Sequence, residues 1–310
     1  MKIGIVGAGA VGAACAFALV MRARAREIVL ADRTRARAKA VATDLRYGVP
    51  LSGRLDIRDG DYDDLADAGM VMVTAGINEA TGGAIDRSDA SGRLRLLETN
   101  AKIYRELVPK IVAAAPAAFI LVVTDPPDPL TDLARIIARH DRVLSTGTYL
   151  DSLRLQVHIA AALCVDPSAV EAQILGEHGT SEVFIWSGVR IAGVPLEKIV
   201  AGRGLTCATL CQQIEREVRY ANITIIEGNK ASQYGIGIVS ARIAEIVLAD
   251  EQAVIPIGSY RKRFGITLSL PSVLGKQGVV QELMPPLSRK EEAALQRSVE
   301  VLREAVSRLG

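Results

Sequence analysis

The stretch Ile3-Gly4-Ile5-Val6-Gly7-Ala8-Gly9-Ala10-Val11-Gly12 decides the fold of this 310-residue chain. Its first four residues form the short apolar run of a buried strand, and Gly7, Gly9 and Gly12 have the G-x-G-x-x-G spacing that joins such a strand to a helix. The first glycine permits a tight turn, the second lets a pyrophosphate approach the backbone, and the third lets the helix pack closely on the strand. The spacing therefore predicts a dinucleotide-binding turn, with phosphate oxygens at the start of the helix.

An acidic residue stands at the distance from this turn that a ribose contact requires. Asp32 follows the apolar run 28–31 and lies twenty residues after Gly12. A carboxylate there accepts hydrogen bonds from a ribose diol and repels a 2′-phosphate, so we expect NAD rather than NADP. Arg33 and Arg35 argue in the other direction, because a nearby arginine can accept that phosphate.

Composition and hydropathy argue against several classes of protein. The net charge of +2 gives no reason to expect a nucleic acid or an anionic membrane as the main partner. Residues 3–21 are uncharged and resemble a signal peptide or an anchor, but such a segment would not need glycines at fingerprint spacing. The four cysteines lack C-x-x-C spacing and are expected to be reduced thiols. We therefore expect a cytoplasmic enzyme that spans no membrane and binds no metal.

The apolar pattern predicts an α/β fold with two domains and no linker. In the first part, expected strands alternate with helices, which indicates a doubly wound parallel Rossmann sheet over residues 1–147. These strands are expected at 3–6, 28–31, 54–58, 70–74, 119–123 and 143–145, and the helices at 10–21, 34–46 and 93–114. Residues 148–310 are expected to form an α+β catalytic domain. Its strands are expected near 172–175, 189–192, 253–258 and 266–270, and its helices near 206–228, 232–249 and after a capping box at Ser288 and Glu291.

A group of polar residues in the middle of the chain suits proton transfer to a carbonyl. Asp151 and Arg154 stand in the run 148–154, and His178 stands in the glycine-flanked turn 176–179. A histidine passes protons near neutral pH, an aspartate fixes its tautomer, and an arginine grips a carboxylate with two hydrogen bonds. Taken alone, the same residues could also be unrelated polar groups on separate surfaces.

Residues 77–92 are polar and glycine-rich and have no regular pattern, which is typical of a functional lid or of disorder. Arg93 begins the helix that is expected after them. A lid that delivers Arg93 to a carbonyl would exclude water and polarise the C=O bond. The alternative is a solvated loop with an arginine at a helix start.

Taken in order, these motifs resemble the L-lactate/malate dehydrogenase family of NAD-dependent 2-hydroxy acid dehydrogenases over nearly the whole chain. The resemblance implies that His178 donates and accepts the proton, paired with Asp151. It implies that Arg93 polarises the carbonyl and that Arg154 binds the substrate carboxylate. The family's NAD-binding positions correspond to Gly7, Gly9, Ala10, Val11, Gly12, Asp32, Thr74, Ala75, Gly76 and Asp125.

The resemblance also implies partners and an assembly. The partner is a small 2-oxo or 2-hydroxy acid, and the chain is expected to form a homo-oligomer, either a dimer or a tetramer. Ser232 falls where the family lines the substrate pocket with a small hydroxyl residue.

Asp125 departs from the family pattern. The family's Thr-Asn-Pro-Val-Asp run appears as Thr124-Asp125-Pro126-Pro127-Asp128, and the usual asparagine contacts both substrate and nicotinamide. An ionised Asp125 can accept the same hydrogen bonds but cannot donate them. Three interpretations stay open: a partly protonated carboxyl, a preference for oxidised nicotinamide, or recognition of a donor on an unusual substrate.

Arg87 predicts which 2-hydroxy acid the enzyme prefers. The family discriminates between substrates six residues before the arginine that corresponds to Arg93, with arginine in malate and glutamine in lactate dehydrogenases. A guanidinium at position 87 can pair with a second carboxylate, which favours malate and oxaloacetate. The alternatives are a lactate-type or bulkier 2-hydroxy acid, a catalytically silent NAD-binding sensor, or an NAD-dependent glycosidase, for which metal ligands are lacking.

Overall fold

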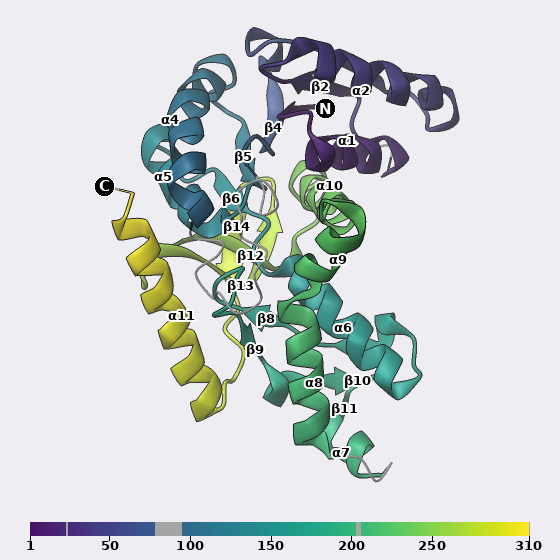
Figure 1. The fold of residues 1–310 in the computed structure, drawn as a ribbon, viewed down its shortest axis with the longest axis vertical. Helices are drawn as coiled ribbons and strands as arrows, with labels where there is room; N and C mark the ends of the chain where they lie inside the picture. Colours follow the sequence, from purple (N-terminus) through teal and green to yellow (C-terminus); the bar gives the residue numbers. More distant parts are fainter. Residues whose placement is uncertain (23, 78–94, 203–205, 310) are drawn as a thin grey trace.

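The computed structural model describes residues 1–22, 24–77, 95–202 and 206–309, and its centre is a nine-stranded sheet (Figure 1). The strand order is β14-β13-β12-β6-β5-β4-β1-β2-β3. The six strands of the first part pair in parallel, as the alternation predicts. These strands are β1 (Lys2–Val6), β2 (Glu27–Ala31), β3 (Asp56–Asp59), β4 (Ala68–Val73), β5 (Phe119–Val122) and β6 (Val143–Ser145).

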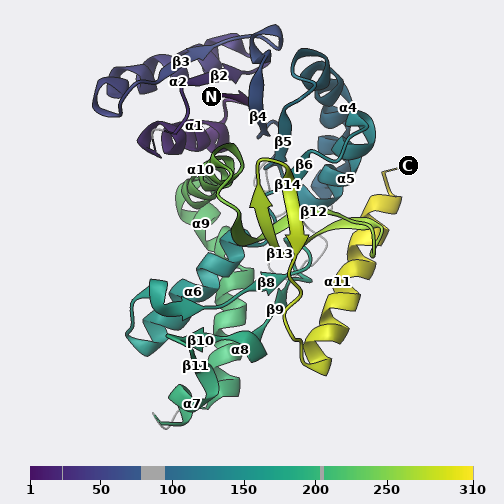
Figure 2. The same ribbon diagram turned by 180° about the vertical axis from the view of Figure 1, so that it is seen from behind.

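Helices cover both faces of this sheet (Figures 1 and 2), which confirms the doubly wound fold class. Alternate residues of β4 explain the two layers. Met70 and Met72 face the core that contains α1 and α10, whereas Val71 and Val73 face the core that contains α4 and α5. The helices are α1 (Ala10–Arg22), α2 (Arg35–Gly48), α4 (Leu97–Ala114), α5 (Pro127–Ala138), α6 (Tyr149–Leu163), α7 (Leu196–Ala201), α8 (Cys207–Arg219), α9 (Ala221–Asn229), α10 (Tyr234–Ala249) and α11 (Arg289–Ser307).

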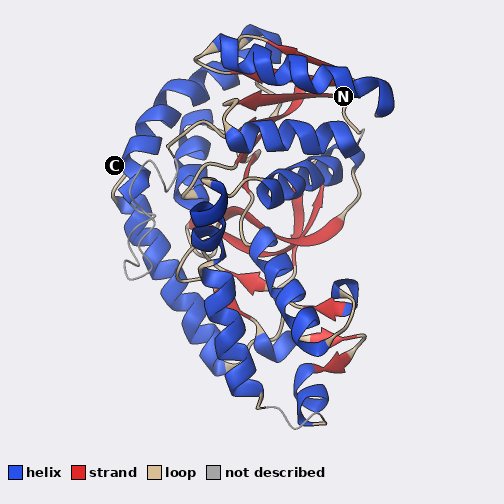
Figure 3. Cartoon of the chain, turned by 45° about the vertical axis from the view of Figure 1, so that its right-hand side comes forward, coloured by secondary structure: helices blue, strands red, loops and turns tan. Residues whose placement is uncertain are grey.

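The second part of the chain extends the same sheet. Strand β12 pairs antiparallel with β6 through Gly258 and Ser145, and β13 and β14 continue the edge. Figure 3 shows one group of short strands near the end of the molecule formed by α7 and α8, where Figure 1 labels β10 and β11. The other short pair, β8 and β9, lies beside the large sheet, because Gly176 after β8 pairs with Ser269 of β13. The strands are β7 (Val170–Glu171), β8 (Ile174–Leu175), β9 (Val183–Phe184), β10 (Arg190–Ile191), β11 (Val194–Pro195), β12 (Ala253–Arg261), β13 (Ile266–Gly275) and β14 (Gly278–Glu282).

Two helical regions differ from the sequence prediction. The single helix expected over 206–228 is wrong, because α8 ends at Arg219 and α9 begins at Ala221. The sequence pattern also did not predict α5, which begins with prolines at positions 127 and 129. Both prolines lie in its first turn, where a backbone N–H has no partner in the helix and proline is tolerated. The capping box at Ser288 and Glu291 is confirmed at the start of α11.

A buried carboxylate connects α5, β6 and the loop that carries His178. Asp128 of α5 is fully buried; its Oδ1 accepts a hydrogen bond of 2.7 Å from Ser145 Oγ of β6. Its Oδ2 accepts one of 2.8 Å from the backbone N of His178. Burial raises the pKa of the Asp128 carboxyl to about 6, because the charged form is poorly solvated there.

This shift predicts a pH-dependent cost of ionising Asp128. The folded chain holds the Asp128 proton more tightly than the unfolded chain. The protonated carboxyl therefore contributes stability that is fully present below about pH 4 and is lost as pH rises to about 6. Asp128→Asn stays neutral throughout. Relative to the parent, its free energy of unfolding should therefore improve between these pH values, by up to roughly 3 kcal/mol.

The measurement is denaturant unfolding of both proteins at several values between about pH 4 and 7. Asp141→Asn is the matched control, since the side chain of Asp141 is 72% exposed. A difference between Asp128→Asn and the parent that stays constant with pH would contradict the prediction.

Candidate active site

A single pocket collects most of the residues that the sequence singled out. It contains about 1100 Å³ of empty space and opens to solvent. The turn before α1 and the carboxyl ends of β4 and β5 form one side, and α6, α9 and α10 form the other. Its lining includes Gly9, Ala10, Val11, Thr74, Gly76, Asp125, Arg154, His178 and Ser232 from the predicted set. The same pocket thus holds cofactor-binding and substrate-binding candidates together.

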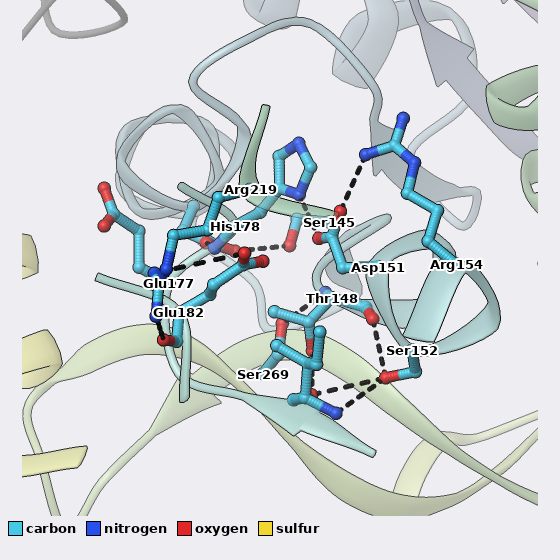
Figure 4. Close-up of polar contacts among 12 residues, drawn as sticks. Ser145, Thr148, Asp151, Ser152, Arg154, Glu177, His178, Glu182, Arg219 and Ser269 are labelled. Carbon is cyan, nitrogen blue, oxygen red and sulfur yellow. Dashed lines mark hydrogen bonds and ion pairs between the residues drawn. The ribbon is translucent and has the colours of Figure 1, made fainter. Parts of the chain in front are cut away.

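Asp151 links the imidazole of His178 to the guanidinium of Arg154 (Figure 4). His178 Nδ1 lies 2.5 Å from Asp151 Oδ2, and Arg154 Nη1 donates to Asp151 Oδ1 over 2.9 Å. The Asp151 side chain is only 3% exposed, so its charge is compensated by these contacts rather than by water. The arrangement turns Nδ1 toward Asp151 and Nε2 toward the pocket.

Hydrogen bonds between α6 and the segment before His178 fix this geometry. Ser152 Oγ donates to the carbonyl of Thr148 and accepts from the backbone N of Ile174, at 2.9 Å each. Thr148 Oγ1 donates to the carbonyl of Ile174, and the backbone N of Thr148 donates to Ser269 Oγ of β13. The first turn of α6, which carries Asp151, is therefore held against β8, which precedes His178.

The loop after His178 has its own support from α8. Arg219 Nη1 donates to the carbonyl of Thr180, and Nη2 donates to the carbonyl of Glu182 (Figure 4). The Arg219 guanidinium also stacks on Phe184, 4.9 Å from the ring centre. These contacts order the chain on the far side of the histidine.

Asp125 faces the other nitrogen of the same imidazole. Its Oδ1 lies 3.7 Å from His178 Nε2, and its side chain is 22% exposed. Asn100 of α4, which no sequence motif indicated, holds this segment: its Nδ2 donates to the carbonyls of Asp125 and Ile77. Its Oδ1 accepts from the backbone N of Ile77. An asparagine in an ordinary helical pattern gives no signal of such a role.

The glycine-rich turn fits a dinucleotide. Gly7 has φ +107°, and a Cβ atom at Gly12 would lie 1.9 Å from the carbonyl oxygen of Gly7. The turn therefore requires glycine at both positions. A Cβ at Gly9, by contrast, would meet no protein atom within 4 Å, so that side of the turn is open for a ligand. Thr74 Oγ1 donates to the Gly7 carbonyl, and Ala75 N lies beside Gly7, so these residues support the turn.

Asp32 reaches the same turn from the end of β2. Its Oδ2 accepts from the backbone N of Ala8 over 2.7 Å, and Oδ1 accepts from Thr34 N over 2.8 Å. Arg35 could have accepted the 2′-phosphate of NADP, but it is paired with Asp59 at 3.0 Å and with Asp61 at 2.6 Å. The carboxylate stands where the fingerprint places the ribose contact.

Other residues of the site fall outside these expectations. Arg87 and Arg93 lie outside the described residues. Asn222 of α9 and Thr146 after β6 also line the pocket, and no sequence motif indicated either residue. Among the described residues, no helix is long and apolar enough to span a membrane, and no three His, Cys, Asp or Glu side chains are grouped to hold a metal ion.

The chemistry available here is proton transfer beside an anion-binding group. Nε2 of His178 faces the pocket, Asp151 stabilises the imidazolium, and Arg154 offers further guanidinium donors for a carboxylate. These groups suit a substrate with a carbonyl or hydroxyl carbon next to a carboxylate.

Comparison with known proteins gives matches along the whole chain. The model of the lactate/malate dehydrogenase NAD-binding domain matches residues 1–143, and that of the family's alpha/beta C-terminal domain matches residues 148–309. L-lactate dehydrogenase of Chloroherpeton thalassium is 42% identical over 310 residues, with 99% of each chain covered. L-lactate dehydrogenase of Deinococcus radiodurans is 42% identical over 311 residues, with 100% of each chain covered.

A solved structure agrees with these matches. The minor L-lactate dehydrogenase from Enterococcus mundtii has a TM-score of 0.91 and 32% identity, and the alignment covers 100% of this chain and 98% of that one. The matched NAD-binding domain and the fit of the glycine turn identify the cofactor as NAD. The chain belongs to the lactate/malate dehydrogenase family and is an NAD-dependent 2-hydroxy acid dehydrogenase.

Proposed function

We propose that this protein is an L-lactate dehydrogenase, which interconverts L-lactate and pyruvate with NAD. The names of the full-length relatives support this alternative over the malate preference derived from Arg87. That preference rested on one side chain that lies outside the described residues. The observation that carries the reaction type is the His178–Asp151–Arg154 group in the pocket that the glycine turn also lines.

Each residue of this group has a role in the proposed reaction. His178 gives its Nε2 proton to the carbonyl oxygen of pyruvate and takes it back from lactate. Asp151 holds the ring and stabilises the imidazolium, and Arg154 binds the carboxylate. Arg93 is proposed to polarise the carbonyl. When NADH is bound, it supplies the hydride for the carbonyl carbon.

The proposal also gives roles to the residues that line the cofactor and substrate parts of the pocket. Asp32 binds the adenosine ribose, and the backbone around Gly9, Ala10 and Val11 faces the phosphates. Ser232 contributes a hydroxyl to the substrate side of the pocket. We also propose the domain boundary at residues 147 and 148, immediately before the first turn of α6.

The substrate test compares pyruvate with oxaloacetate. The parent should reduce pyruvate with the higher kcat/KM in the presence of NADH. Arg87→Gln should change the ratio by less than about tenfold, because the proposed preference for pyruvate does not depend on this arginine. Steady-state assays with both acids provide the measurement. The dicarboxylate interpretation would be supported if the parent preferred oxaloacetate and Arg87→Gln abolished that preference in kcat/KM.

The proton-transfer role predicts a large effect at position 178. His178→Asn should lower kcat for pyruvate reduction by about 10² or more and leave NADH binding nearly unchanged. His158→Asn is the matched control, since His158 pairs with Glu217 at the surface of α6 and does not line the pocket. NADH fluorescence titrations and single-turnover rates separate binding from chemistry. Half-normal turnover in His178→Asn would exclude the proposed role.

We further propose that the chain forms a homo-oligomer through α1 and α10. These helices pack closely, because a Cβ at Gly237 would lie 2.6 Å from the backbone of Ala14. Their exposed sides carry Phe17 at 52% and Met21 at 63% on α1, and Ile238 at 54% on α10. Such apolar exposure on adjacent helices suits a second copy of the chain.

This assembly should appear as a dimer or tetramer in light scattering at micromolar concentration. The double variant Phe17→Asp, Ile238→Asp should shift the population toward monomer, since two charges would be buried without partners. Val254→Asp, an equally exposed change at 51% on β12, is the control. A monomeric parent would contradict the proposal.

A further inference from the structure

The imidazole of His178 lies between two carboxylates. Asp151 Oδ2 lies 2.5 Å from Nδ1, and Asp125 Oδ1 lies 3.7 Å from Nε2. The second carboxylate is therefore on the side of the ring from which the proton leaves. This contact suggests a further role for Asp125, because it places the side chain against the proton donor.

The length of the second contact matters. At 3.7 Å the pair is within ion-pair distance but is longer than an N–H···O hydrogen bond. The Asp125 charge therefore acts on the ring through space rather than through a direct hydrogen bond. The pocket is largely screened from water at this point, since the His178 side chain is 14% exposed and that of Asp125 is 22% exposed.

We propose that Asp125 acts on the reaction through His178, as a second carboxylate that stabilises the imidazolium from the substrate side. The proposal rests on the proposed function of His178 as proton donor. An opposite charge within about 4–6 Å favours the charged form of a titrating group. Asp125 should therefore keep His178 protonated to higher pH than Asp151 alone would.

Other charged groups around the ring are already engaged. Arg154 of α6 pairs with Asp151, and Asp128 of α5 accepts from the backbone N of His178. Glu177, the neighbour in the same loop, accepts from Ser181. Arg219 of α8 donates to carbonyls of the following loop and pairs with Glu182 at 4.0 Å. Charged residues within 78–94 lie outside the described part of the chain.

The consequence is a bias between the two directions of the reaction. Pyruvate reduction uses the imidazolium, whereas lactate oxidation uses the neutral ring. A second carboxylate extends reduction to higher pH and delays oxidation to higher pH. The direction that the chain favours near neutral pH is therefore reduction of the 2-oxo acid.

The test is the isosteric variant Asp125→Asn. The pH midpoints of kcat/KM for pyruvate reduction and for lactate oxidation should both move about one unit lower, because the imidazolium loses one partner. Asp141→Asn removes the same charge at the surface and should move neither midpoint. If Asp125→Asn only disturbed the structure of the site, kcat/KM would fall in both directions while the two pH midpoints stayed unchanged, and this result would contradict the proposal.

Direct titration of the imidazole tests the proposal without turnover. The chain has three histidines, so the ¹³C-histidine NMR signals of the NAD⁺ complex can be assigned with His178→Asn and His158→Asn. The pKa of His178 should be about one unit lower in Asp125→Asn than in the parent. An unchanged or higher pKa overturns the proposal, even if activity changes. A parent that reduces no 2-oxo acid would refute the proposed function, and the titration would still decide what Asp125 does to the ring.

Discussion

The contact between Asp151 and His178 joins two segments separated by 27 residues, and the site depends on it. A buried carboxylate in a pocket is costly unless charged or polar partners compensate it. Asp151 is compensated by the imidazole and by Arg154, so the groups that serve proton transfer and carboxylate binding also satisfy each other. The hydrogen bonds of Thr148 and Ser152 make this pairing possible, because they hold α6 to the segment that leads into His178.

The sequence predicted those parts of the fold that are determined by residues close together in the chain. Gly7 and Gly12 could be recognised because a tight strand-to-helix turn excludes side chains at those positions. The parallel strands were visible because residues buried on both faces give short continuous apolar runs. The extension of the sheet by β12 to β14 depends on pairing between Ser145 and Gly258, and no local pattern reports such a distant partner.

The candidate site also contains residues that the sequence predicted and residues that it did not. His178, Asp151 and Arg154 carry distinctive chemistry in a recognisable order, and the structure brings them together. Asn100 and Asp128 act through hydrogen bonds to the backbone of other segments, which a single sequence does not reveal. The preference for a dicarboxylate is not confirmed. It rested on the position of Arg87 in the sequence alone, and Arg87 lies outside the described residues.

The sheet shared by the two parts of the chain has a mechanical consequence. In many enzymes, two rigid halves rotate about a hinge to enclose the substrate. Here such a rotation would pull β12 away from β6 and separate α10 from α1, whose backbones meet at Gly237 and Ala14. The pocket walls formed by the glycine turn, α6 and α10 are therefore tied to one sheet. The relative positions of His178, Arg154 and the glycine turn are set once, when the chain folds, and each substrate molecule meets them already in place.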